Sequence, residues 1–130
     1  MSEQTLDLRP RNIAQVIEGM AFTFNPAKAK GLNATIQFHV SGKEGGDWYL
    51  DIADGVCRCQ RGVIPNSTMT ITTPAAVWLA IARKEMKGSV AFMTGKFKVK
   101  GRADLLLRFD SIFSREPTVA DIASKGWLEE

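Results

Sequence analysis

Residues 95–114, "GKFKVKGRADLLLRFDSIFS", join a short strand pattern, a glycine and a strongly apolar helix pattern within a small piece of chain. In the strand pattern, Phe97 and Val99 alternate with three lysines, so apolar and charged side chains point to opposite faces. The helix pattern carries its apolar face on Leu105, Leu106, Phe109, Ile112 and Phe113. The stretch therefore predicts a corner where a strand with one charged face leads into an amphipathic helix.

Four more strand patterns and three more helix patterns precede this corner. Apolar residues that alternate with polar ones predict strands at residues 34–40, 48–54 and 67–73, and a short segment between two glycines predicts a further strand at residues 56–61. Glycines bracket the third of these, so residues 34–61 predict an antiparallel meander. A periodic apolar face predicts a helix over residues 12–24, and residues 75–88 and 89–95 predict a second helix and a short helical turn.

The order of these elements favours an α+β fold, in which helices pack on one face of a five-stranded, mostly antiparallel sheet. We expect a single domain over residues 1–114, because no internal repeat or low-complexity tract interrupts the order. Residues 115–130 predict a C-terminal tail with a short helix and Trp127 near its end. This tail is interpreted either as a lid or as a docked end of the chain.

The composition is that of an ordinary globular protein, with 130 residues, 45% of them hydrophobic, and a formal net charge of +3. The longest apolar run is far shorter than the ~20 residues that span a bilayer. The polar N-terminus contains acidic residues, unlike a signal peptide, so the expected location is cytoplasmic. Cys57 and Cys59 stand too close for an unstrained disulfide, which favours free thiols in a reducing compartment.

The chain lacks the sequence motifs of phosphate binding, nucleophilic hydrolysis and zinc-dependent hydrolysis. The one histidine, His39, falls on the polar side of its strand and is distant in sequence from both cysteines. The basic residues have no interleaved aromatic side chains of the kind that stack on bases. We therefore predict a protein without catalytic residues, cofactor or metal, which is not an enzyme and does not bind nucleic acid.

Two features carry more apolar surface than a simple amphipathic helix needs. Residues 75–82 are apolar almost all the way round, which predicts that this segment is enclosed or faces apolar groups on two sides. Leu107 points away from the apolar face of its helix. It is interpreted either as a lone exposed leucine or as a sign that the helix is contacted on both sides. The lysines of residues 96–100 are interpreted first as protection of a sheet edge, with guidance to anionic membranes as the alternative.

Three segments together resemble the sterol carrier protein 2 domain family: "FNPAKAKGLNATIQFHVSGKEGGDWYLDIADG", "TMTITTPAAVWLAI" and "AFMTGKFKVKG". The resemblance extends from about Met20 to Phe113 and follows the same order of elements. It implies a sheet covered on one face by helices, which enclose an apolar tunnel for sterols, fatty acids, fatty acyl-CoAs or other lipids. The chain ends in "WLEE", without the peroxisomal signal of some relatives.

The apolar patterns and the resemblance together suggest a lining for such a tunnel. The predicted lipid-binding residues are Phe38, Leu50, Ile71, Trp78, Ile81, Phe92, Met93, Phe97, Leu105, Leu106, Phe109 and Phe113. Any one of them would equally serve in an ordinary core, so only the whole set carries the prediction. Because each buried methylene of a lipid contributes ~0.8 kcal/mol, binding is expected without specific polar contacts and with loose selectivity.

The leading hypothesis is a small lipid-binding or lipid-transfer protein. A first alternative is an accessory module of lipid or isoprenoid-quinone metabolism, which presents a hydrophobic intermediate to partner enzymes. A second is a protein-interaction domain with a closed tunnel, and the last is an enzyme that uses His39. The sequence specifies neither the lipid nor the oligomeric state.

Overall fold

The computed structural model describes residues 9–127 and contains each strand and helix that the sequence predicts, although the helix expected over residues 75–88 ends at Ala82. The strands are β1 (Ala34–Ser41), β2 (Gly46–Ala53), β3 (Val56–Arg61), β4 (Met69–Pro74) and β5 (Lys98–Gly101). The helices are α1 (Ile13–Thr23), α2 (Ala75–Ala82), α3 (Gly88–Met93), the 3-10 helix η1 (Ala103–Arg108), α4 (Phe109–Ile112) and α5 (Val119–Ser124). Residues 1–8 and 128–130, on which the predicted absence of a signal peptide and of a peroxisomal signal depends, lie outside the described residues.

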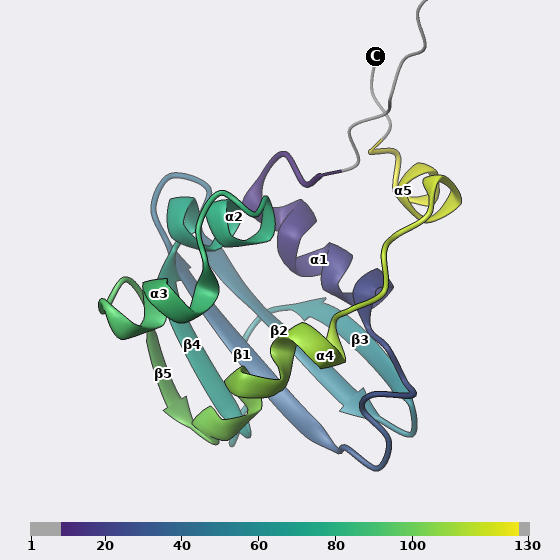
Figure 1. The fold of residues 1–130 in the computed structure, drawn as a ribbon, viewed down its shortest axis with the longest axis horizontal. Coiled ribbons are helices and arrows are strands. Elements are labelled where there is room, and N and C mark those ends of the chain that lie inside the picture. The colour runs from purple at the N-terminus through teal and green to yellow at the C-terminus, as the bar shows by residue number, and fades with distance from the viewer. Residues whose placement is uncertain (1–8, 128–130) are drawn as a thin grey trace, which may run out of the picture.

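The five strands form one sheet in the order β3-β2-β1-β4-β5, and the helices from α1 to α4 lie on one face of it (Figure 1). Three of the four strand pairs are antiparallel, including the predicted meander, while β1 and β4 are parallel. The α+β, mostly antiparallel prediction is therefore confirmed. The parallel pair arises because residues 62–68 carry the chain from the β3 edge across to the other side of β1.

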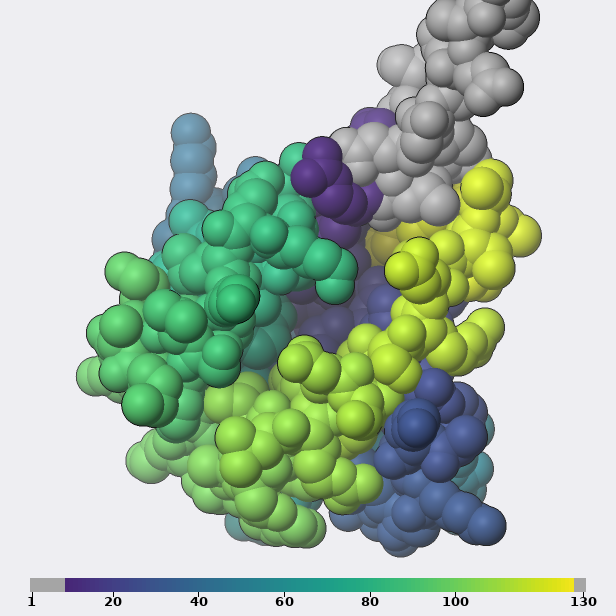
Figure 2. All heavy atoms as spheres, viewed as in Figure 1, coloured from purple at the N-terminus to yellow at the C-terminus, as the bar shows by residue number. Residues whose placement is uncertain are grey.

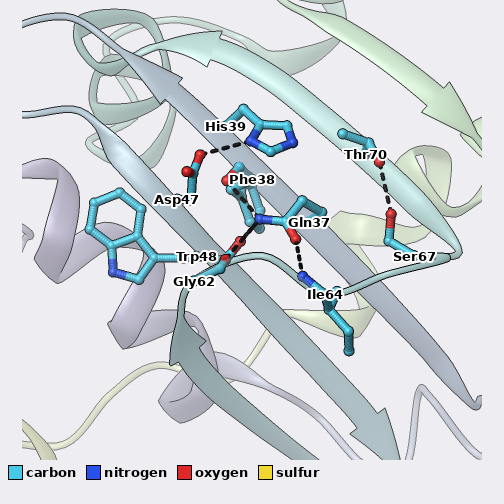
Figure 3. A network of polar contacts seen from close by, with 9 residues as sticks. All are labelled: Gln37, Phe38, His39, Asp47, Trp48, Gly62, Ile64, Ser67 and Thr70. Atoms are coloured by element: carbon cyan, nitrogen blue, oxygen red, sulfur yellow. Dashed lines mark hydrogen bonds and ion pairs between the residues drawn. The ribbon is translucent and has the colours of Figure 1, made fainter.

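The crossing segment explains a residue that the sequence pattern misplaced. Gln37 belongs to the polar side of β1, yet it is only 2% exposed. Its side-chain nitrogen donates to the carbonyl oxygens of Trp48 and Gly62 at 2.9 and 3.0 Å, and its side-chain oxygen accepts from the backbone N–H of Ile64 at 2.8 Å (Figure 3). The crossing segment therefore covers this part of the outer face. Gln37 supplies hydrogen-bond partners for the backbone groups that this segment and β2 bring to it, as buried polar groups require.

His39, two residues further along the same strand, stays at the surface as predicted. Its Nδ1 lies 2.7 Å from Oδ1 of Asp47, and both side chains are more than 40% exposed (Figure 3). This pair is a contact between neighbouring strands on the outer face, because the register places His39 opposite Asp47.

The core lies between the sheet and the helices. Phe38, Leu50 and Ile71 are fully buried, and the register places Phe38 of β1 beside Ile71 of β4. Helix α1 packs against β3 and α2 and buries an apolar face that includes Ile13 and Ile17. Its start is fixed by Asn12, whose side chain accepts a hydrogen bond from the backbone N–H of Gln15 at 2.9 Å.

The corner between β5 and α4 differs in detail from the expected single α-helix. Gly101 adopts a φ of 88°, and a Cβ there would collide with the carbonyl oxygen of Thr68. After this tight exit the chain winds as the 3-10 helix η1 before the short helix α4. The expected apolar face nevertheless turns inward: Leu105 and Ile112 are buried, while Leu107 is 84% exposed.

Within residues 9–127, no helix has both the length and the apolar content that crossing a bilayer requires.

Candidate functional site

A cavity of about 980 Å³ opens between helices α1, α2 and α4 and the segment that follows α4. Figure 2 shows it as a hollow at the centre of the helical face, with α1 visible at its bottom. The lining comes from helices and their flanking segments, and no strand residue contributes to it. A cavity of this size lies at the upper end of the ~300–1,000 Å³ range of small-molecule sites.

Trp78 of α2 connects the cavity to the core. Its ring packs edge-on against Phe38 at 5.3 Å and Phe97 at 5.4 Å between ring centroids, and against Phe109 at 6.4 Å. Phe109 in turn lies 5.1 Å from Phe113. Edge-to-face packing at these distances is favourable, so a row of aromatic rings forms one firm wall of the cavity.

Helix α1 forms another wall. Val16 and Met20 line the cavity from this helix, together with Phe22 near its end. Gly19 has no side chain, and an added Cβ there would stand 3.7 Å from the ring of Trp127. Trp127 therefore lies at ordinary van der Waals distance from this position of the helix, and its ring also meets Phe22 edge-on at 6.2 Å.

Backbone and side-chain hydrogen bonds hold these walls together. Asn25 and Arg115 donate their backbone N–H groups to the carbonyl oxygens of Ile112 and Thr23, at 2.7 and 2.9 Å, which joins the end of α4 to the end of α1. Beyond α2, Arg83 donates to the carbonyl oxygen of Pro10 at 2.8 Å. The cavity is therefore bounded by segments that are far apart in sequence but fixed to one another.

The cavity combines apolar walls with charged residues. Its apolar lining includes Trp78, Ile81, Ile122 and Trp127, in addition to the groups of α1 and α4. The charged residues along it are Arg9, Arg11, Lys84, Asp110, Arg115 and Glu116. Several of these are exposed, so an occupant would meet apolar groups inside and charged groups near solvent.

The predicted lipid-binding residues divide into three groups in the structure. Trp78, Ile81, Phe109 and Phe113 line the cavity. Phe38, Leu50, Ile71, Phe97 and Leu105 are buried in the core, and Leu106 is half-buried against it. Phe92 and Met93 are exposed on α3, at 37% and 83%. The lining of a lipid site in this chain thus stays a prediction, now centred on the first group.

The sequence interpretation assigned no ligand role to α1, and it left the tail open between a lid and a docked end of the chain. The apolar face of α1 was recognised, but periodicity cannot separate residues that face the sheet from those that face a hollow. The tail gave a weaker signal, because Ile122 and Trp127 stand in a short polar segment. Both residues line the cavity, so the segment 115–127 contributes to the candidate site.

A second cavity, of about 620 Å³, lies beside β3 and is lined by polar and apolar residues in similar measure, with Cys57 and Cys59 among them. Burial raises the pKa of the Cys57 thiol to about 12 and that of Cys59 to about 11. Such thiols are poor nucleophiles and poor metal ligands at neutral pH. In the described part of the chain no cluster of three metal-ligating side chains occurs. The first cavity is therefore the stronger candidate site.

Solved structures share this fold. A secondary alkylsulfatase from Pseudomonas sp. superimposes with a TM-score of 0.66 at 20% identity, over 76% of this chain and 16% of that enzyme. The palmitated Sterol Carrier Protein 2 Like 2 from Aedes aegypti gives 0.64 at 20% identity, over 82% and 95% of the two chains. A UbiJ-SCP2 ubiquinone synthesis protein gives 0.59 at 17% identity, over 78% and 92%. These similarities establish the architecture.

Curated relatives match the chain with only a part of their own length. Hydroxysteroid dehydrogenase-like protein 2 from Xenopus tropicalis is 28% identical over 92 residues, which are 70% of this chain and 22% of that protein. The chain spans between 16% and 28% of the relatives of this name. The sequence pattern of the SCP-2 sterol transfer family matches residues 17–114, the whole sheet with helices α2 to α4 and most of α1. The chain belongs to the SCP-2 sterol transfer family.

Proposed function

We propose that this chain binds a hydrophobic ligand in the cavity between α1, α2 and α4 and transfers it without chemical change. SCP2 domains are lipid-binding modules, and one structural neighbour is a palmitated protein. The observation that carries the proposal for this chain is the cavity itself, about 980 Å³ with a wall of aromatic rings. An open cavity of this size with an apolar wall favours a ligand over a closed protein-interaction domain.

The chemistry of the lining favours lipids as a class. Burying an alkyl chain contributes ~0.8 kcal/mol per methylene, so a fatty acid, a fatty acyl-CoA, a sterol or a similar molecule would bind through its apolar part. The charged residues along the cavity, such as Lys84 and Arg115, would lie near the polar end of the ligand. Selectivity among lipids of similar volume is expected to be low.

Binding without catalysis fits the placement of the titratable groups. The one histidine of the chain lies on the outer face of the sheet, paired with Asp47, while the cavity lies among the helices on the other face. Neither cysteine lines the large cavity, and both thiols have raised pKa values. The described cavity lining therefore offers no nucleophile paired with a base.

A second candidate is presentation of the bound lipid to a partner enzyme. It is favoured by the curated relatives, in which the matched segment is a small part of a longer dehydrogenase-like chain, and by the ubiquinone synthesis neighbour. Free transfer predicts that loaded protein exchanges its lipid with vesicles unaided. Presentation predicts slow unaided exchange and co-purification with an enzyme of lipid or quinone metabolism.

Ile81→Trp tests the proposed site. Ile81 is half-buried and lines the cavity, so the larger ring should occupy ligand space. A titration with a fluorescent fatty acid is expected to show about tenfold weaker binding, since overpacking typically costs 1–3 kcal/mol. Val56→Trp is the control, because Val56 is 45% exposed at the β2–β3 hairpin and lines neither cavity. Equal affinity of both folded variants and the original chain would contradict this site.

A further inference from the structure

The two edge strands of the sheet, β3 and β5, differ in how open they are to pairing with another strand (Figure 1). Strand β5 has four residues and carries the exposed lysines Lys98 and Lys100. Short edge strands and lysines are features that prevent a sheet edge from pairing with another chain. Strand β3 has six residues and contains neither lysine nor proline. The β3 edge is therefore the less protected of the two.

The backbone of β3 presents hydrogen-bonding groups to the outside at alternate residues. The backbone N–H of Gly62 donates to the carbonyl oxygen of Asp47 at 2.9 Å, so these two residues form a hydrogen-bonded pair at the end of the β2–β3 ladder. Such pairs alternate along an antiparallel ladder, so every second residue counted back from Gly62 bonds to β2. The backbone groups of Cys57, Cys59 and Arg61 therefore point away from β2. Within the described part of the chain they have no backbone partner.

The second cavity, of about 620 Å³, lies against this edge. Its lining includes the five consecutive residues 57–61. Successive side chains of a strand point to opposite faces, so a cavity that touches all five lies beside the strand rather than over one face. The opposite wall is helix α1, which packs against β3 and contributes Ala21 and Phe22. The β3 edge thus opens into a groove between a strand and a helix, which we call the β3 groove.

The charged residues of the β3 groove are mainly basic. Arg58, Arg61 and Lys125 line it and are exposed, whereas Glu18 is its one acidic lining residue, which gives a net charge of +2. None of the three basic residues forms an ion pair with another described residue. The Arg61 guanidinium lies 4.6 Å above the ring of Trp48, which holds it at the groove. Arginine, unlike lysine, is enriched at protein interfaces.

We propose that the β3 groove binds an acidic, extended peptide segment of a partner protein, which adds to the sheet as a further strand. The outward backbone groups of Cys57, Cys59 and Arg61 would pair with the backbone of the segment. Alternate side chains of the segment would enter the groove beside Phe22, and acidic side chains on the other face would lie near Arg58. Free backbone donors and acceptors select an extended chain, and the unpaired positive charge selects an acidic one.

The charge of β3 disfavours a second copy of this chain as the occupant. Two β3 strands paired with each other would bring the arginines of both copies together, and like charges across a strand pair are destabilising. The inference goes beyond the proposed function and does not depend on it. The β3 groove and the larger cavity have Phe22 as their one common lining residue, so peptide binding requires no lipid.

The experiment is amide hydrogen exchange of the full chain, measured by NMR with and without a synthetic peptide. The peptide has blocked ends and alternates glutamate with valine over about seven residues, within the usual length of a strand. A peptide with lysine in place of glutamate is the control for charge. The double variant Arg58→Gln with Lys125→Gln tests the groove, and Lys98→Gln with Lys100→Gln at the β5 edge is its matched control. All four side chains are exposed, so folding should be retained, which circular dichroism verifies.

We expect the acidic peptide to slow the exchange of the Cys57, Cys59 and Arg61 amides. The amides of Arg58 and Gln60 already bond to β2, so their exchange should stay unchanged. The groove variant should bind the peptide about fivefold more weakly, since it loses two exposed charge contacts, and the β5 variant should bind like the original chain.

Three results would overturn the proposal. The first is no slowing of exchange by the acidic peptide at low salt, or slowing without the alternation along β3. The second is equal binding of the lysine peptide, or equal weakening by the β5 variant, either of which would show that charge acts without the groove. The third is slowing of the same amides at high protein concentration without peptide, which would assign the β3 edge to a second copy of the chain.

Discussion

The closed core and the open cavity are lined by similar apolar residues but differ in what lies opposite those residues. On the closed side, Leu50 and Ile71 are fully buried between the sheet and the helices. On the open side, Ile81 and Phe113 are only half-buried, because they line the cavity between α1, α2 and α4. An apolar pattern thus predicts that a side chain leaves water, but the spacing of the opposite layer decides whether it meets protein or a hollow.

The largest expected effect is a difference in the free energy of unfolding between a variant in the closed core and a variant at the open cavity. Leu50→Ala should lower the free energy of unfolding by about 2–5 kcal/mol, because it opens a new cavity in a filled core. Ile81→Ala should cost no more than about 1.5 kcal/mol, because it only enlarges space that already exists. Urea unfolding of both variants measures the difference.

For ligand affinity the order of the two variants is reversed, and the larger effect is expected from Ile81→Ala. Ile81→Ala should change the affinity for a fluorescent fatty acid while the protein stays folded, whereas Leu50→Ala should leave the affinity of the folded fraction unchanged. Similar stability losses for the two variants would contradict the distinction between a filled and a hollow half.

A smaller effect, on the rate of ligand release, is expected at Trp127, where the tail lines the cavity. Trp127 lines the cavity and packs on Phe22, so Trp127→Ala should release a bound fatty acid several-fold faster if the tail acts as a lid. The cost in stability should be about 1 kcal/mol, the centre of the range for point mutations. Stopped-flow transfer to vesicles measures the release rate.

The matched control is Val119→Ala in the same tail. Val119 is 45% exposed on α5 and does not line the cavity, so its variant should release ligand at the original rate. An unchanged rate for Trp127→Ala would make the tail a docked end of the chain without influence on the ligand.

The strands and helices could be predicted because their patterns are local. Alternation in β1 and β2 and the apolar face of α1 were sufficient to predict their positions, and the family resemblance agreed with the order of elements. The corner after β5 was predicted correctly as a change from strand to helix, although its 3-10 winding was missed. That winding follows the tight exit at Gly101, which depends on the backbone of Thr68 far away in sequence.

The burial of Gln37 and the exact lining of the cavity could not be predicted for a related reason. Gln37 is buried because residues 62–68 cross the outer face, and no local pattern encodes this crossing. In the same way, Trp78 and Phe97 have similar apolar character, yet only Trp78 reaches the cavity. Long-range packing decides both outcomes.

The central claim is that the cavity holds a lipid, and native mass spectrometry of the purified full chain tests it most directly. The account predicts a mass above that of the chain, with the extra mass released into an organic extract and identified there as a lipid. A bare protein mass that stays unchanged after incubation with fatty acids, sterols and quinone analogues would contradict the claim.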